Sequence, residues 1–109
     1  MAYDEALADR VRERLGDNPE ITERKMFGGI AFMLSGNMAV GVSKEDLMVR
    51  IDPDDQDEAL AQPGVRVFDM TGRPTKGWIL VAPEATGEDN GLQKWIDAGL
   101  DFAGSLPPK

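Results

Sequence analysis

Between residues 21 and 51 the chain alternates strand-like apolar segments with very short turns, which strongly restricts its fold. The segment 38–42 follows a turn at Ser35-Gly36-Asn37, and the segment 47–51 follows a polar turn at residues 43–46. A parallel pair of strands needs a crossover of about a dozen residues or more, which these connections cannot supply. We therefore expect three consecutive strands in an antiparallel meander.

The first of these strands contains two adjacent glycines, Gly28 and Gly29, inside the apolar run that ends at Leu34. Glycine weakens a strand, because it loses more backbone entropy than other residues and packs no side chain. We expect one long strand over residues 21–34, in which the pair bends the strand or lets another backbone come close. Neither a G-x-G-x-x-G pattern nor a lysine-bearing loop surrounds the pair, so it does not resemble a phosphate site.

Helical and strand-like patterns flank the meander. Residues 4–15 and 53–61 read as helices, with Asp52 and Pro53 at the start of the second. Strands are expected at 65–70 and 77–81, followed by a last helix that begins with a capping box at Thr86. Its apolar stripe comprises Leu92, Trp95, Ile96, Gly99 and Ala103. The order α-β-β-β-α-β-β-α predicts an α+β fold, with helices on one face of a five-stranded antiparallel sheet.

Length and charge limit the kind of protein. With 109 residues, the chain is expected to form a single domain over residues 1–109 and no second domain. Its net charge of −8 disfavours direct nucleic-acid binding, which depends on Lys and Arg contacts to phosphates. No apolar run reaches the roughly 20 residues that span a bilayer, and the N-terminus does not resemble a signal peptide. We expect a cytoplasmic protein without membrane contact.

The residue types that most often carry catalysis are missing. The chain has no histidine and no cysteine, which excludes Ser-His-Asp and Cys-His arrangements and thiolate metal sites. The acidic run that starts at Asp52 is not an EF-hand, since it has Asp57 where glycine is required and Pro63 where glutamate is required. We expect no catalytic residues, no metal and no cofactor, and hence a protein that is not an enzyme.

Two groups of side chains are candidates for a partner surface. Alternation places Met48 opposite the apolar side of its strand, where it could belong to an uncovered dimer or partner face or could be of no consequence. Arg73 and Lys76 lie in the loop before the last strand, where they could hold an acidic partner or only keep a turn soluble. With Arg50, these residues form the expected partner surface.

Other candidates also permit a structural or a functional interpretation. Trp78 and Trp95 could line a ligand groove, although aromatic residues at core spacing usually pack. Arg10, Arg12 and Arg14 could form a phosphate-binding patch. Because they are interleaved with Asp9 and Glu13, we favour a solvated face of mixed charge.

Several segments together resemble the TfoX/Sxy N-terminal domain family over about residues 5–103. The resemblance rests on Lys25-Met26-Phe27-Gly28-Gly29, on the segment from Gly36 to Val42, on Asp46 to Asp52, and on Lys76-Gly77-Trp78 with the strand that follows. It implies the α-β-β-β-α-β-β-α architecture, which YjbR-like and secretion chaperone-like domains share, and a structural role for these motif residues. The family is named after bacterial competence regulators that are thought to assist transcription with a cyclic-AMP receptor protein. Those regulators carry a second, C-terminal domain.

Two functions follow as hypotheses. The first is a non-enzymatic regulatory module that binds a protein partner, such as a transcription factor, or forms a homodimer through its sheet. The alternative is a small-ligand-binding domain or weak enzyme, with a cleft between the sheet and the terminal helices near Gly28, Trp78 and Trp95.

Overall fold

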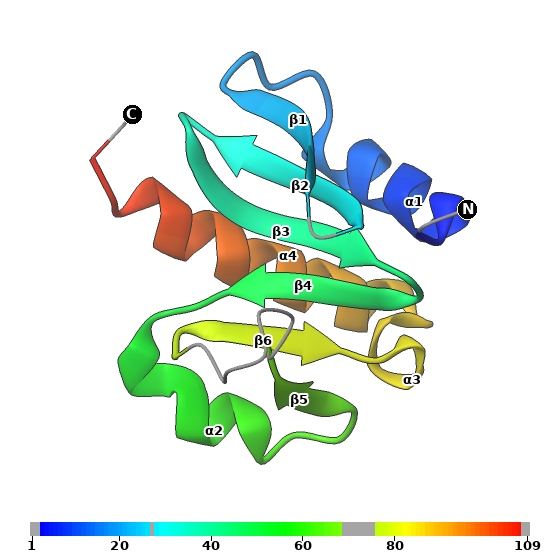
Figure 1. The fold of residues 1–109 in the computed structure, drawn as a ribbon, viewed down its shortest axis with the longest axis vertical. Coiled ribbons are helices and arrows are strands. Elements are labelled where there is room, and N and C mark those ends of the chain that lie inside the picture. The colour runs from blue at the N-terminus through cyan, green and yellow to red at the C-terminus, as the bar shows by residue number, and fades with distance from the viewer. Residues whose placement is uncertain (1–2, 27, 69–75, 108–109) are drawn as a thin grey trace.

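The computed structural model describes residues 3–26, 28–68 and 76–107, which form an α+β fold (Figure 1). This confirms the expected fold class. Along the chain the elements are α1 (Glu5–Leu15), β1 (Ile21–Met26), β2 (Gly29–Leu34), β3 (Asn37–Ser43), β4 (Asp46–Arg50), η1 (Pro53–Asp55), α2 (Gln56–Leu60), β5 (Val65–Val67), β6 (Trp78–Val81), α3 (Pro83–Thr86) and α4 (Asp89–Gly104).

The described strands form one antiparallel sheet in the order β1-β2-β3-β4-β6-β5, with six strands instead of the expected five. The extra strand comes from the segment 21–34. It is two strands, β1 and β2, which pair with Met26 opposite Gly29. The prediction of one long strand was therefore wrong, because the chain reverses between these two residues.

The two glycines at this reversal are needed for different reasons. Gly28 has a φ of 72°, a left-handed conformation that costs glycine little and most other residues more. Gly29 lies so close to β3 that a Cβ added to it would overlap the carbonyl oxygen of Val42. The expected close approach of another backbone is confirmed at Gly29. The expected bend within a strand is a turn between strands.

The next turns are also tight. Ser35 and Gly36 connect β2 to β3 with φ values of 50° and 87°, the positive pair that a two-residue hairpin turn prefers. Gly77, with a φ of 86°, precedes β6; its N–H donates to the Gln56 side chain, and its carbonyl accepts from the Ile51 N–H at 2.8 Å. Gly77 thus fixes the start of β6 against the segment that follows β4.

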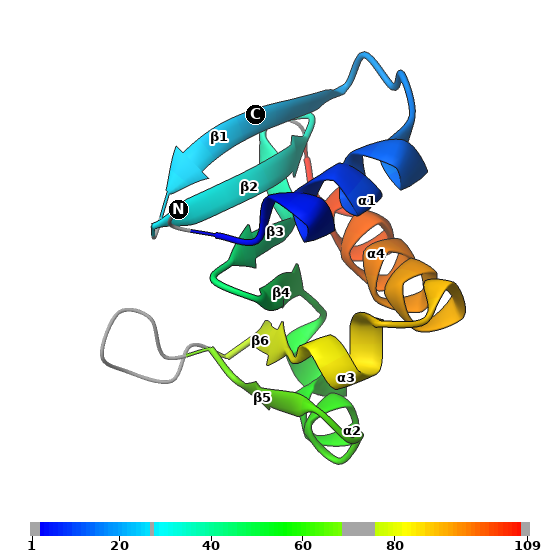
Figure 2. The same cartoon turned by 90° about the vertical axis from the view of Figure 1, so that its right-hand side faces the viewer.

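Helices α1, α3 and α4 lie on one side of the sheet (Figure 2), as expected. The main core lies beneath them, and α2 adds Ala59 to it. Helix α4 crosses β3 closely, since a Cβ on Gly99 would lie 2.5 Å from the Ala39 carbonyl oxygen. The buried side chains of α4 in this core are Leu92, Trp95 and Ile96.

Two helix starts differ in how well they were predicted. The Asp52 side chain accepts from the Asp54 N–H at 2.9 Å, and Pro53 occupies the first position of η1, which continues into α2. Thr86 does not cap α4. It is buried at the end of the short helix α3, and Glu88 precedes α4 without a side-chain cap. The expected capping box was therefore wrong.

Candidate protein-interaction surface

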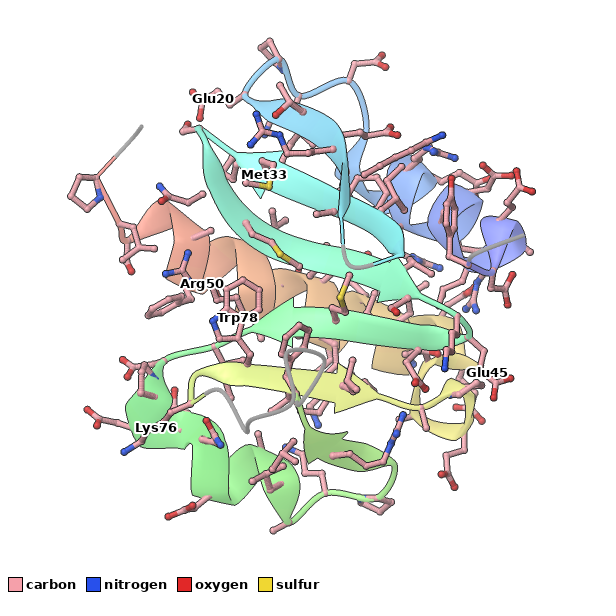
Figure 3. All side chains as sticks on the ribbon, in the orientation of Figure 1. Glu20, Met33, Glu45, Arg50, Lys76 and Trp78 are labelled. Atoms are coloured by element: carbon pink, nitrogen blue, oxygen red, sulfur yellow. The ribbon has the colours of Figure 1, made fainter. Side chains whose placement is uncertain are left out.

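We call the side of the sheet opposite the helices the helix-free face. It is formed by every second residue of the strands, and these residues pair with one another across the sheet. Arg24 pairs with Ala31, Gly41 with Met48, and Met48 in turn with Leu80. At the end of the sheet Arg50 pairs with Trp78. Directly opposed residues project to the same side of a sheet. Figure 3 looks onto this face and shows Arg50 beside Trp78, with Met33 further along the sheet.

Met48 lies on the helix-free face but is fully buried, with 0% of its surface exposed. It belongs to a second, small apolar cluster with Ala31, Met38, Phe68 and Leu80. Met48 is therefore neither a partly exposed side chain nor a direct contact for a partner. The expectation of an uncovered methionine was wrong, because residues beyond its own strand, Phe68 among them, complete a core on this side.

A bulge in β3 explains how Met38 reaches this cluster. Phe32 pairs with Val40 but Met33 pairs with Met38, so Ala39 has no opposite residue. The extra residue changes the alternation. Met38 and Val40, which strict alternation places on the same side, thus belong to different apolar clusters.

Met33 and Trp78 are the partly exposed apolar residues that pack on this second cluster. The Trp78 ring lies 5.5 Å from the Phe68 ring, at an angle of 44°. This contact packs the Trp78 indole against Phe68, while part of the indole remains in contact with solvent. A fixed, half-buried tryptophan is the kind of side chain that dominates the energy of many protein interfaces.

Arg50 is held between two aromatic side chains. Its guanidinium carbon lies 5.3 Å from the centre of the Trp78 ring and 5.4 Å from that of Phe102 in α4. Cation–π contacts of this kind contribute about 0.5–2 kcal/mol each, depending on solvent exposure. Among the described residues, no carboxylate or carbonyl accepts a hydrogen bond from Arg50. Within this part of the chain, its N–H donors are therefore unpaired.

Further cations border this surface. Arg24 and Lys76 are exposed and have no ion pair within the described part of the chain. Arg66, by contrast, pairs with Asp46 at 2.5 Å and is neutralised locally. Arg73 lies outside the described residues. Of the expected partner residues, the structure thus brings Arg50 close to Trp78, places Lys76 just before that strand, and buries Met48.

The family-motif residues mostly have structural positions. Gly28, Gly29, Gly36 and Gly77 shape the turns described above, and Trp78 begins β6. Lys25 is an exposed residue of β1. The backbone of Met26 ends that strand, and Phe27 lies outside the described residues.

The arginines of α1 are occupied by carboxylates. Arg12 forms two hydrogen bonds to Glu23, at 3.0 and 2.9 Å, and one to Asp9 at 2.7 Å. The hydrogen bond to Glu23 raises the pKa of Arg12 further above its ordinary value. Arg10 and Arg14 both reach Asp89, and their hydrogen bonds lower the pKa of that carboxyl. These pairs agree with the mixed-charge face rather than with a phosphate-binding patch.

A groove of about 560 Å³ lies between α4 and the η1–α2 segment. Trp95 and Phe102 line it together with Ile51, and Asp52, Asp55, Glu58 and Asp101 contribute carboxylates. Of the residues expected to line a cleft, Trp95 lines this groove, whereas Gly28 and Trp78 are not among its lining residues. Among the described residues no cluster of three or more acidic side chains has the geometry of a metal site.

Phe102 is the residue of this region that sequence reasoning missed. It follows Trp95 by seven residues, two helical turns, so both lie on the same side of α4. This spacing was the available signal. Phe102 connects the groove to Arg50, because its ring lines the groove and also contacts the Arg50 guanidinium group.

These features define a small α+β domain with an apolar and cationic patch on its helix-free face. The chain belongs to the TfoX N-terminal domain family, whose model matches residues 13–103. No curated protein and no solved structure gives a significant match. None of the helices in the described parts of the chain is both long and apolar enough to cross a membrane.

Proposed function

We propose that this protein is a non-enzymatic regulatory module that acts by binding a protein partner, as in the competence regulators that gave the family its name. The partner is bound on the helix-free face, and direct DNA contact is not required. The observation that carries this proposal is the half-buried Trp78, packed against Phe68 and beside Arg50. A rigid aromatic residue next to unpaired cations offers both the apolar contact and the charge that protein interfaces combine.

The charge of the molecule supports a protein partner rather than DNA. The chain carries −8 overall, and the arginines of α1 are occupied by carboxylates. Among the described residues, the unpaired cations on or bordering the helix-free face are Arg24, Arg50 and Lys76, too few for the counterion release that drives DNA binding. They suffice to orient an acidic protein surface.

Affinity capture from native cells with matched variants tests this proposal. Lys76→Glu reverses an exposed charge at the border of the helix-free face, two residues before Trp78, and Lys94→Glu makes the same change in the groove. We expect a discrete protein to be captured by the wild type and by Lys94→Glu but at least about fivefold less by Lys76→Glu. Equal capture by both variants would exclude the helix-free face, and capture of DNA instead of a protein would exclude the proposed mode of action.

A second copy of the chain is another possible occupant of this face. Sedimentation of the purified protein distinguishes this case. A dimer that Lys76→Glu dissociates would place a homodimer on this face, whereas a dimer insensitive to that change would use another surface.

The groove supports the second candidate, a small-ligand-binding domain. Its volume of about 560 Å³ lies in the range of small-molecule sites, which is about 300–1,000 Å³. Its carboxylates favour a cationic ligand. A thermal-shift screen of cationic metabolites tests it, since a ligand that binds only the native state raises the melting temperature. A shift that Asp101→Asn abolishes would support this function, and the absence of any shift across the screen would exclude it.

A further inference from the structure

We propose that Arg50 is a carboxylate receptor, and that the segment bound on the helix-free face carries an aspartate or glutamate that pairs with it. This inference rests on the proposed function, because it names the chemistry of the partner on the same surface. The contacts of Arg50 with Trp78 and Phe102 carry it, together with the absence of an acceptor among the described residues.

Two aromatic rings hold the Arg50 side chain in place. The two rings contact the guanidinium group and restrict its movement, so less conformational entropy is lost when it binds. Contacts with rings leave the N–H groups at the edge of the guanidinium plane available. Those groups form the fork that matches the two oxygens of a carboxylate.

The surroundings of Arg50 favour a charge pair. Arg50 is half-buried, so a charge pair formed here is less screened by water than one at a fully exposed site. Asp52 and Asp101 line the groove with Phe102. Their negative charge repels an acid on that side and favours approach over Trp78.

The distance between Met33 and Trp78 sets the length of a segment that can contact both residues. Met33 lies on β2 and Trp78 on β6, separated in the sheet by β3 and β4. At about 4.8 Å between neighbouring strands, this distance is roughly 14 Å, which about five extended residues span. A segment with an acidic residue at Arg50 and apolar residues over Trp78 and Met33 therefore fits the face.

Selection from a displayed library of random short peptides on the immobilised wild type, followed by affinity measurement on variants, tests the inference. We expect the enriched peptides to contain Asp or Glu beside apolar residues. They should bind Arg50→Gln at least about tenfold more weakly than the wild type, and Arg50→Lys should fall between, because lysine keeps the charge and loses the fork. Arg24→Gln, the same change on an exposed residue of the same face, should cost less than about threefold.

The outcomes separate the two claims. Peptides that lose affinity for Trp78→Leu but bind Arg50→Gln like the wild type would overturn the receptor and leave the proposed surface intact. Peptides without an acidic residue, or insensitive to both variants, would overturn the receptor and count against the surface. If no peptide is enriched, the receptor is also overturned, while capture from cells decides the proposed function separately.

Discussion

The terminal methyl group of Met48 occupies the space where a side chain on Gly41 would begin. A Cβ on Gly41 would lie 2.6 Å from the Met48 Cε and 2.7 Å from the Ile30 carbonyl oxygen. The Met38 methyl group lies 3.1 Å from the same point. The flexible side chains of Met48 and Met38 therefore fill the space beside Gly41. They belong to the apolar cluster beneath the proposed interaction surface.

This packing predicts a large effect of removing the Met48 side chain. Met48→Ala should lower the free energy of unfolding by about 2–5 kcal/mol, because it opens a cavity in a fully buried site. Met48→Leu keeps most of the volume and should cost less than about 1.5 kcal/mol. Urea unfolding measures both, and a loss below about 0.5 kcal/mol for alanine would mean that Met48 is not packed as described.

Gly28 and Gly29 should respond differently to alanine. Gly29→Ala forces a Cβ into the Val42 carbonyl oxygen and should destabilise by more than about 2 kcal/mol, because the backbone must move. Gly28→Ala meets no atom within 4 Å and should cost only about 1 kcal/mol for its positive φ. Gly28→Asn should cost still less, since asparagine tolerates this conformation. Similar losses at the two positions would contradict the described turn.

Helix α4 contains a second matched pair of glycines. Gly99→Ala should destabilise by about 1–3 kcal/mol despite the better helix propensity of alanine, because its Cβ meets the Ala39 carbonyl oxygen. Gly104→Ala places its Cβ 3.7 Å from Leu34, an ordinary contact, and should be neutral or stabilising by up to about 1 kcal/mol. Thermal unfolding of both variants checks this, and equal effects would mean that α4 does not approach β3 closely.

The cluster of Asp89 with Arg10 and Arg14 predicts a dependence of stability on pH. The hydrogen bonds lower the pKa of Asp89 in the folded state. Their contribution to stability is therefore present above the pKa of the unfolded chain, near 4, and is lost as the pH falls through the folded pKa. The loss of stability caused by Asp89→Asn should be constant above about pH 5 and disappear in stronger acid.

Unfolding measured across this pH range tests the dependence. The same substitution in a variant with Arg10→Gln and Arg14→Gln is the control, and it should show no such change with pH. A loss that persists unchanged in acid would contradict the role of the arginines.

The limits of sequence reasoning are clear at individual residues. The antiparallel meander and the helix start at Asp52 could be predicted, because turn length and capping chemistry are local. The hairpin at Gly28 was missed, since an apolar run continues on both sides of it. Met48 was misjudged because its burial depends on Phe68, which is distant in sequence, and on Met38, which joins the same cluster through the bulge at Ala39.

The candidate surface was predictable to a similar extent. Arg50 and Lys76 were predicted as cations of a partner surface, and Trp78 as a motif residue. The pairing of Arg50 with Trp78 depends on the register between β4 and β6, and its contact with Phe102 on the path of α4. Neither can be read from local spacing.

Site-specific photocrosslinking in native cells tests the central claim, that a protein binds the helix-free face, most directly. A photoreactive residue is placed at Arg24 on that face or at Lys76 on its border and, as a control, at Glu58 in the groove or Asp97 on α4. We predict that Arg24 and Lys76 yield the same discrete protein adduct, and that the control positions do not. Adducts from Glu58 or Asp97 alone, or adducts with DNA from Arg24 and Lys76, would contradict the account.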